Sequence, residues 1–419
     1  MNARPDFLFA NTPIPDETIL IHQTFVNREQ ELRTAQALFR PNQLKNQIYA
    51  IHGNSRVGKS HLAIKLAQDM VAEHGIIFFY ISANMRGSSI DVLEGLFELV
   101  CEYIESISWQ LDDEKSNHLR FLELYLAQIR LLFMSSNAKI AVRHLQKEAK
   151  KIKSGFSGKI PFLNFGSEVS GESARGKDEE QTIEIGRPDV RGVRLILCFL
   201  LDQLAFIAER EILILVDDLD LLEEASVGKK ENDELINHLK PIVGLKPVAV
   251  WVTSRQQYFI ERGKEMFDFI KVRMMAQTEL IDIYKARVKH FNGDQQIFTQ
   301  DVLEELTNGF RGVAGSFLTE CYQFWRYHLG KPYPLGVKQL SEYLSAEIDD
   351  LLRNPETSEI FEKIRTAVVI DKKTEITIKD VKKGHGLIYR VLLPKAYGQD
   401  TYEIIPLFAK VIKNQASHP

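Results

Sequence analysis

The sequence predicts an α/β fold in which helices flank a central parallel sheet. Three observations lead to this prediction. Short apolar segments typical of strands alternate with segments of helical periodicity over residues 25–275. A glycine-rich loop joins the strand expected at 48–52 to the helix expected at 60–74, which is the order of a right-handed βαβ unit. Beyond residue 275 the pattern changes to helices and then to a mixed segment, which indicates further domains.

The composition is that of a globular protein without a membrane span. The chain has 419 residues, of which 44% are hydrophobic and 26% charged. No run approaches the roughly 20 apolar residues that cross a bilayer, and the first residues lack a secretory signal pattern. The three cysteines, Cys101, Cys198 and Cys321, show no metal-binding spacing and suit a reducing compartment. We therefore expect a cytoplasmic protein with no membrane partner.

The first 275 residues contain five expected strands. Residues 1–24 carry three prolines and predict an irregular lead-in. Long helices are expected within 89–150, the second from Phe121 to Ala149, and a further helix over 190–209. The polar, glycine-rich stretch of about 150–190 predicts an inserted loop or loose hairpin. The strands are expected at 48–52, 76–82, 212–216, 248–252 and 269–273.

The remaining residues predict two smaller units after the core of residues 25–275. Three helices, at 278–291, 302–306 and 315–327, predict a helical lid over residues 276–350. Residues 351–419 predict a small α+β domain of winged-helix-like order. Its expected parts are a helix at 360–368, a short helical stretch that Ile376 opens and that covers 378–383, and strands near 387–393 and 402–405.

The glycine-rich loop, which we call the P-loop, satisfies the pattern GxxxxGK[ST] at every fixed position. Its glycines let backbone N–H groups turn toward a phosphate, and the following helix adds the positive end of its dipole. Lys59 supplies a charge for the β and γ oxygens, and Ser60 supplies a hydroxyl for Mg²⁺. The loop therefore predicts ATP and Mg²⁺ as ligands. Its residues are Gly53, Asn54, Ser55, Arg56, Val57, Gly58, Lys59 and Ser60.

Two adjacent carboxylates follow the apolar strand 212–216. A strand that ends in aspartate is what a P-loop requires for its metal, so Asp217 is expected to hold Mg²⁺. Asp218 points elsewhere on the pleat and is a candidate to orient or deprotonate the attacking water. The alternative is a pair that caps the following turn. Asp220 is a further candidate of lower rank.

Polar residues also end the strand at 248–252. Thr253 and Arg255 are candidates to contact the γ-phosphate, and Arg255 to report its hydrolysis, unless Arg255 is a solvated loop residue. In the expected lid, Arg311 lies in the stretch Gly309 to Gly312. It is a candidate to reach the nucleotide, and a surface position is the alternative.

These residues together resemble the AAA+ ATPases of the origin-recognition type and the related STAND switch ATPases. The resemblance covers residues 20–330 and includes the P-loop, the strand 212–218 and the strand end Val252 to Arg255. The start Phe25 to Leu32 is similar to a segment that packs near the adenine in this group, which implies that Arg28 binds nucleotide. The turn Gly309 to Phe317 is similar to the lid motif but lacks its proline.

The resemblance implies a Mg-dependent ATPase that acts as a switch or in assembly. It implies a homo-oligomer or a larger complex, a protein or DNA partner, and DNA-directed or prokaryotic defence processes as settings. Arg262 is one candidate for an arginine finger. An alternative is a DNA-binding adaptor in which the nucleotide is mainly structural. A small-molecule kinase is disfavoured, because Asp217 lies far beyond the P-loop and a lid follows.

The C-terminal domain has its own two alternatives. Six basic residues are candidates to meet DNA phosphates if this domain binds DNA. Otherwise they form a solvated face, and the domain docks on the ATPase core or on a partner. The residues are Lys372, Lys373, Lys379, Lys382, Lys383 and Arg390.

Overall fold

The computed structural model of the protein describes most of the chain. The predicted lead-in of residues 1–24 lies outside the described residues, as do Arg311 and most of the predicted insertion. The same is true of four of the six basic residues of the C-terminal domain, Lys379, Lys382, Lys383 and Arg390. The described ranges are 25–38, 47–107, 113–134, 137–141, 182–186, 188–222, 231–262, 265–292, 295–310, 312–378, 391–394 and 401–417.

A five-stranded parallel sheet forms the centre of the N-terminal part. The strands lie in the order β2-β5-β6-β1-β7, and each neighbouring pair is parallel. The carboxyl ends of all five strands therefore meet at one edge of the sheet. The strands are β1 (Ile48–Gly53), β2 (Ile77–Ser82), β5 (Ile212–Asp217), β6 (Val248–Arg255) and β7 (Phe267–Val272).

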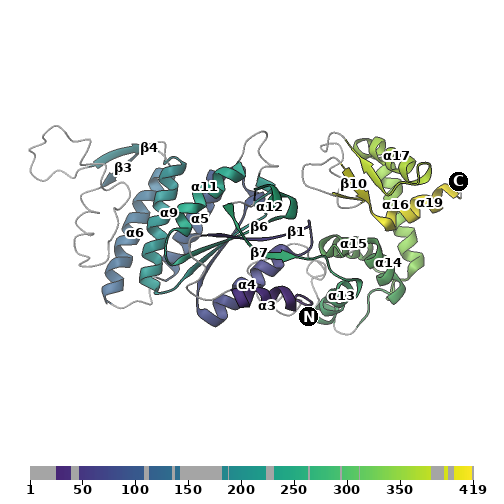
Figure 1. Ribbon diagram of the computed structural model, residues 1–419, viewed down its shortest axis with the longest axis horizontal. Coiled ribbons are helices and arrows are strands. Elements are labelled where there is room, and N and C mark those ends of the chain that lie inside the picture. Colours follow the sequence, from purple (N-terminus) through teal and green to yellow (C-terminus); the bar gives the residue numbers. More distant parts are fainter. Residues whose placement is uncertain are drawn as a thin grey trace, which may run out of the picture.

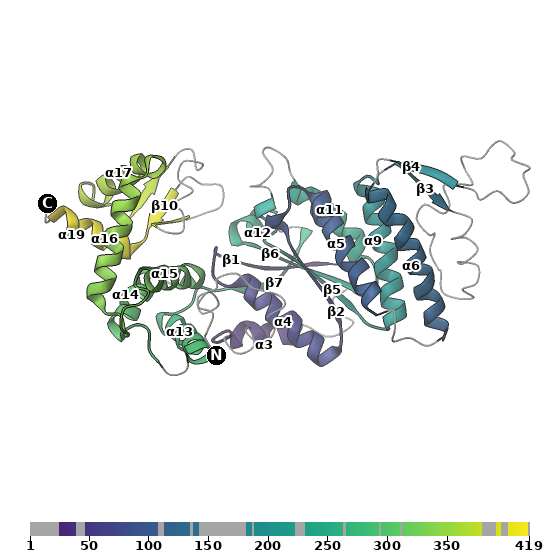
Figure 2. The ribbon, with the colours of Figure 1, turned by 180° about the vertical axis from the view of Figure 1, so that it is seen from behind.

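Helices cover both faces of this sheet (Figures 1 and 2). One face carries α3 (Glu29–Leu38) and α4 (Lys59–His74). The other carries α5 (Ser89–Ser106), α9 (Val190–Ala208), α11 (Glu231–Val243) and α12 (Gln256–Arg262). Because side chains alternate along a strand, Leu213 and Leu215 join the core under α4, whereas Ile214 joins the opposite core. The same alternation puts Asp217 on the α4 face.

The helix expected from Phe121 to Ala149 is wrong at residues 137–141, and residues 142–149 lie outside the described residues. Helix α6 (Asp113–Met134) ends early, and β3 (Asn137–Ala141) follows it. β3 pairs antiparallel with β4 (Thr182–Gly186), so a distant segment decides the conformation here over local periodicity. This two-stranded ribbon lies beyond α6 and α9, at the end of the molecule away from α13–α15 (Figure 1).

The C-terminal part consists of a helical region and a small α+β unit. The helices of the region are α13 (Gln277–Asn292), α14 (Gln300–Phe310), α15 (Ala314–Tyr327) and α16 (Val337–Arg353). The unit contains α17 (Pro355–Val369), β8 (Glu375–Thr377), β9 (Leu392–Pro394), β10 (Thr401–Ile404) and α19 (Pro406–Ser417). Its strands form an antiparallel sheet in the order β8-β10-β9. Ile376 lies in strand β8 and does not open a helical stretch, because pairing with β10 holds residues 375–377 extended. Residues 379–383 of the expected stretch lie outside the described residues.

One hydrophobic core joins these two C-terminal parts. Buried side chains of α13 to α16 form a single cluster with those of α17, α19 and the small sheet. Helix α19 packs on α14 so closely that a Cβ atom at Gly309 would lie 2.7 Å from Cβ of Leu407. The predicted fold class is thus confirmed: a parallel sheet flanked by helices, then a helical region and a small α+β unit. The boundary predicted at residue 350 lies inside this shared core and stays a prediction.

None of the helices in the described part of the chain combines the length and the apolar character that crossing a bilayer needs.

Candidate functional site

The P-loop connects the end of β1 to the start of α4, at the edge where the parallel strands end. Arg56 has a φ of 59° and Gly58 a φ of 94°, so two residues of the loop adopt the left-handed region. Such alternation turns successive backbone N–H groups toward one concave side, which is the geometry of an anion-binding nest. A Cβ atom at Gly58 would have no neighbour within 4 Å, so the reason for glycine there is φ and not crowding.

Lys59 is the first residue of α4, and its side chain turns back over the loop. Its Nζ donates a hydrogen bond to the carbonyl of Asn54 at 3.0 Å, and the residue is buried. Burial lowers the pKa of Lys59, while the carboxylates of Asp220, Asp218 and Asp217 act in the opposite direction. The amine and the three carboxylates are therefore close enough to interact. Ser60 follows as the second residue of α4.

Asp217 ends β5, two strands away from the P-loop. Both oxygens of its carboxylate accept a hydrogen bond from a hydroxyl group. Thr253 Oγ1, on β6, donates to Oδ1, and Tyr80 OH, on β2, donates to Oδ2 at 3.0 Å. The two donors fix the orientation of the carboxylate in a site where Asp217 is only 2% exposed.

Asp218 leaves the strand in a left-handed conformation, with a φ of 54°. Its backbone N–H donates to Thr253 Oγ1 at 2.8 Å, and its carboxylate accepts a hydrogen bond from Asn84 Nδ2 at 3.0 Å. Burial and the neighbouring charge of Asp217 raise the pKa of Asp218 to about 7. A carboxyl group with a pKa near neutrality can accept a proton at physiological pH, as a general base must.

Arg255 is paired with a carboxylate in this structure. Its Nε donates to Asp220 Oδ2, and its backbone N–H donates to Asp220 Oδ1 at 3.0 Å. Asp220 is 1% exposed, so this ion pair lies inside the protein beside the P-loop lysine. Arg255 is not a solvated loop residue, which was the alternative.

Sequence patterns carry no distinct signal for three residues of this constellation. Asp220 lies just beyond the adjacent pair Asp217 and Asp218, although it holds Arg255. Tyr80 lies in strand β2 and Asn84 follows it, and this strand carries no motif. Only the sheet order makes β2 the neighbour of β5, with Ser82 in register with Asp217. Once that pairing is known, the alternation of β2 places Tyr80 on the same face as Asp217.

Arg28, expected to bind nucleotide, contacts the protein itself. It is 2% exposed, and its guanidinium donates to the carbonyl of Val57 at 2.6 Å. The same group donates to the carbonyl of Arg273 at 2.8 Å and to Glu31 Oε1 at 2.7 Å. Arg28 therefore links the segment before α3, the P-loop and the residue that follows β7.

The helical region reaches the P-loop through the start of α15. The backbone N–H of Gly315 donates to the carbonyl of Arg56 at 2.8 Å. Gly312, with a φ of 85°, accepts a hydrogen bond from the N–H of Met275. Arg311 lies outside the described residues, so its expected contact with nucleotide stays a prediction. The side chain of Arg262 is also outside them.

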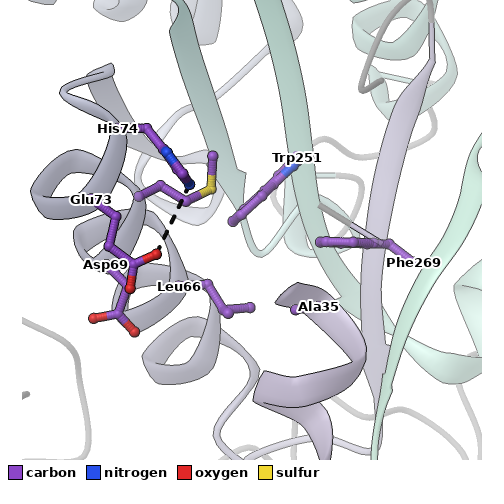
Figure 3. Close-up of a pocket in the computed structure, with 8 residues that line it drawn as sticks. Ala35, Leu66, Asp69, Glu73, His74, Trp251 and Phe269 are labelled. Carbon is purple, nitrogen blue, oxygen red and sulfur yellow. Dashed lines mark ion pairs between the residues drawn. The ribbon is translucent and has the colours of Figure 1, made fainter. Parts of the chain in front are cut away.

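A separate cavity of about 80 Å³ lies between α3, α4 and the sheet (Figure 3). Its floor is aromatic and aliphatic, with Trp251 and Phe269 on the sheet side, and Asp69, Glu73 and His74 lie on α4. These α4 residues belong to the second half of the helix, away from the P-loop at its first turn. The cavity is thus distinct from the constellation around Lys59.

Comparison with known proteins finds similar solved structures. No family model and no curated protein matches the sequence. Cdc6p from Pyrobaculum aerophilum is 12% identical, with 98% of each chain covered and a TM-score of 0.43. A Walker-type ATPase of Pyrococcus abyssi is 14% identical, with 97% of this chain and 99% of that chain covered and a TM-score of 0.45. The ORC2 protein of Aeropyrum pernix, in ADPNP and ADP complexes, is 11% identical, with 100% and 99% covered and a TM-score of 0.48.

Each of the three alignments covers nearly the whole of this chain. The structures include an ORC2 protein and a Walker-type ATPase, and no STAND switch ATPase is among those named. The expected similarity to STAND switch ATPases stays a prediction.

Proposed function

We propose that this protein binds and hydrolyses Mg·ATP and acts as a nucleotide-dependent switch or assembly ATPase. One observation carries the proposal. The P-loop lysine and the carboxylate of Asp217 lie at the same edge of the sheet and on the same face, close enough for their charges to interact. A triphosphate in the P-loop would extend toward this carboxylate.

The P-loop suits the phosphates of a nucleotide. Its left-handed residues orient backbone N–H groups toward one side, and the N-terminus of α4 adds its dipole. The buried amine of Lys59 faces three carboxylates, and a triphosphate would bring it further negative charge. In this proposal Gly53 to Ser60 hold the phosphates, as the sequence predicts.

The residues present also fit a magnesium ion. Ser60 at the start of α4 and Asp217 at the end of β5 supply the hydroxyl and the carboxylate that such a site uses. When bound, the ion would neutralise charge on the phosphate oxygens. Thr253 and Tyr80 hold the carboxylate of Asp217 in a fixed orientation for that ligand, because each of its oxygens accepts one hydroxyl hydrogen bond.

Asp218 and Arg255 supply the remaining roles in the proposal. Asp218, with its raised pKa, is placed to take a proton from a water molecule, and Asn84 holds its carboxylate. Arg255 would exchange its ion pair with Asp220 for the γ-phosphate of bound ATP. Such an exchange would make the position of Arg255 depend on whether the γ-phosphate is present.

The partner belongs to the proposal as well. We propose a homo-oligomer or a larger protein complex, with DNA as a candidate partner of the C-terminal unit. Lys372 and Lys373, the two described members of the basic group, lie on the exposed turn between α17 and β8. The motivation for the DNA-directed setting is the sequence resemblance alone.

The alternative is a DNA-binding adaptor with a structural nucleotide. The two carboxylates Asp217 and Asp218 at the end of β5, each held by its own donors, favour hydrolysis, because an adaptor needs no base beside its metal ligand. Phosphate release by the purified protein, measured with and without duplex DNA, separates the two. Turnover that stops in Asp218→Asn supports the ATPase. Retained nucleotide without turnover, in the presence and absence of DNA, supports the adaptor.

A further inference from the structure

Two carbonyl groups on the outer side of the P-loop accept hydrogen bonds from parts of the chain that are distant in sequence. The carbonyl of Arg56 accepts from the N–H of Gly315 in the helical region, at 2.8 Å. The carbonyl of the next residue, Val57, accepts from the guanidinium of Arg28, at 2.6 Å. The loop is thus held from outside at two consecutive peptide groups.

The consequence follows from peptide geometry. In a planar trans peptide, the carbonyl of one residue and the N–H of the next point in opposite directions. A fixed carbonyl at Arg56 therefore fixes the N–H of Val57, and a fixed carbonyl at Val57 fixes the N–H of Gly58. These N–H groups belong to the part of the loop where φ is positive at Arg56 and Gly58. Their direction decides how well the loop holds a phosphate.

Arg28 is itself held in place by several groups. Its NH1 donates to Glu31 Oε1 and to the carbonyl of Arg273, while its NH2 donates to the carbonyl of Val57 in the P-loop. A buried guanidinium with three acceptors is planar and pre-organised, so it positions the Val57 carbonyl more rigidly than a flexible lysine would. The neighbouring Asn27 donates to Asp282 Oδ2 of α13 at 3.0 Å, which ties this segment to the helical region too.

Gly315 permits a direct backbone contact. A Cβ atom at this position would lie 2.9 Å from Cβ of Arg56 and 3.2 Å from its carbonyl oxygen. Any larger residue would therefore push the start of α15 away from the P-loop. The contact at Gly315 depends on how the helical region packs against the P-loop. The contact at Arg28 depends on the position of the segment before α3.

We propose that Arg28 and Gly315 are positioning residues that set the P-loop amides for nucleotide, so that nucleotide affinity depends on how the helical region is seated. The inference rests on the proposed function and adds a mechanism of regulation at the same site. Arg28 acts through the Val57 carbonyl and not by touching the nucleotide. Linkage then requires that bound nucleotide stabilise the packing of α15 on the P-loop.

The test compares variants by titration with a fluorescent ADP analogue and by hydrogen exchange without nucleotide. Arg28→Lys keeps the charge and loses the fork, and Gly315→Ala adds one methyl group. Each should weaken ADP binding about tenfold, because Arg28→Lys loses the fork that holds the Val57 carbonyl and Gly315→Ala pushes the start of α15 away from the Arg56 carbonyl. Each should also speed exchange of the amides of residues 57 and 58. The control variants are Arg33→Lys, an exposed arginine on α3, and Gly336→Ala, a glycine at the start of α16.

The outcomes separate this inference from the function on which it rests. If the unaltered protein binds no ADP, the proposed function fails. If it binds ADP and both variants match their controls in affinity and exchange, the positioning role is refuted. Because Arg28→Lys is a buried substitution, Asn27→Gly serves as a milder second variant, since Asn27 has a φ of 62° that glycine adopts without strain. It should weaken ADP binding less than Arg28→Lys and leave the melting temperature within the range of the controls.

The double variant tests whether the two contacts act together. If Arg28 and Gly315 set one loop geometry together, the loss in Arg28→Lys/Gly315→Ala is smaller than the sum of the two single losses in free energy. Additive losses would mean that the two contacts act independently, which contradicts the proposal.

Discussion

At the scale of single residues, the site is built from carboxylates that are buried and held by specific donors. Asp217, Asp218 and Asp220 lie within four residues of each other, and each has a different partner. Thr253 and Tyr80 bond to Asp217, Asn84 bonds to Asp218, and Arg255 bonds to Asp220. Different partners suit chemically similar side chains to different roles.

Asp218→Asn tests the proposed general base. The amide is nearly isosteric with the carboxyl group but accepts no proton, so nucleotide binding should persist while hydrolysis slows about 100-fold or more. Phosphate release and an ADP titration on the same preparation measure the two effects. Loss of nucleotide binding would instead identify Asp218 as a metal ligand.

Tyr80→Phe tests the hydroxyl that holds Asp217. Removing it leaves Oδ2 of a buried carboxylate without this donor, so we expect the Mg²⁺ concentration at half-maximal ATP binding to rise about tenfold. Tyr103→Phe is the control, because Tyr103 contacts Phe79 through its ring on the other face of the sheet. Equal Mg²⁺ dependence in both variants would show that Tyr80 does not position Asp217.

At the scale of elements, local sequence predicted what local interactions decide. The P-loop and the apolar strands β1, β5 and β6 were predicted close to their observed positions, because burial on both faces gives continuous apolar runs. Long-range pairing escaped prediction. β3 follows α6 as a strand because residues 182–186 pair with it, and Ile376 is extended because β10 lies beside it.

The same limit applies to the site. Asp217, Asp218 and Lys59 stand next to recognisable motifs, whereas Tyr80 and Asn84 enter only through the position of β2 beside β5. The sequence predicts that Arg28 binds nucleotide, but its observed contact is with the protein. Its guanidinium donates to a P-loop carbonyl, a contact that sequence spacing alone does not reveal.

Gly309→Ala tests the packing of α14 against α19. Alanine favours a helix over glycine by about 1 kcal/mol, whereas overpacking typically costs about 1–3 kcal/mol. With Cβ of Leu407 only 2.7 Å from the added atom, we expect net destabilisation, seen as a lower melting temperature. Gly336→Ala, at the N-cap of α16, is the control for a glycine outside this contact. A higher melting temperature in Gly309→Ala would show that the two helices are not in close contact.

At the scale of the whole molecule, the core beneath α4 belongs to the sheet, while a separate core joins the helical region to the C-terminal unit. Because α13 to α19 share one core, we expect them to unfold as one cooperative unit. Hydrogen exchange in increasing denaturant should give the slowest amides of α14, α17 and α19 a common opening free energy. Clearly separate values for α14 and α17 would mean that the C-terminal unit is independent.

The P-loop lies where these two bodies meet, since Gly315 of the helical region donates to its Arg56 carbonyl. Arg28, from the segment before α3, donates to the neighbouring Val57 carbonyl. A nucleotide bound in the loop would therefore contact the part of the chain where both bodies meet. This arrangement suits a protein whose shape responds to its ligand, provided that the ligand occupies the P-loop and its metal meets Asp217.

Titration of the protein with a fluorescent ATP analogue, with and without Mg²⁺, tests that condition most directly. We expect saturable binding at one nucleotide per chain, its loss in Lys59→Ala, and its loss of Mg²⁺ dependence in Asp217→Asn. A protein that binds no nucleotide, or a Lys59→Ala variant that binds as tightly as the unaltered chain, would contradict the account.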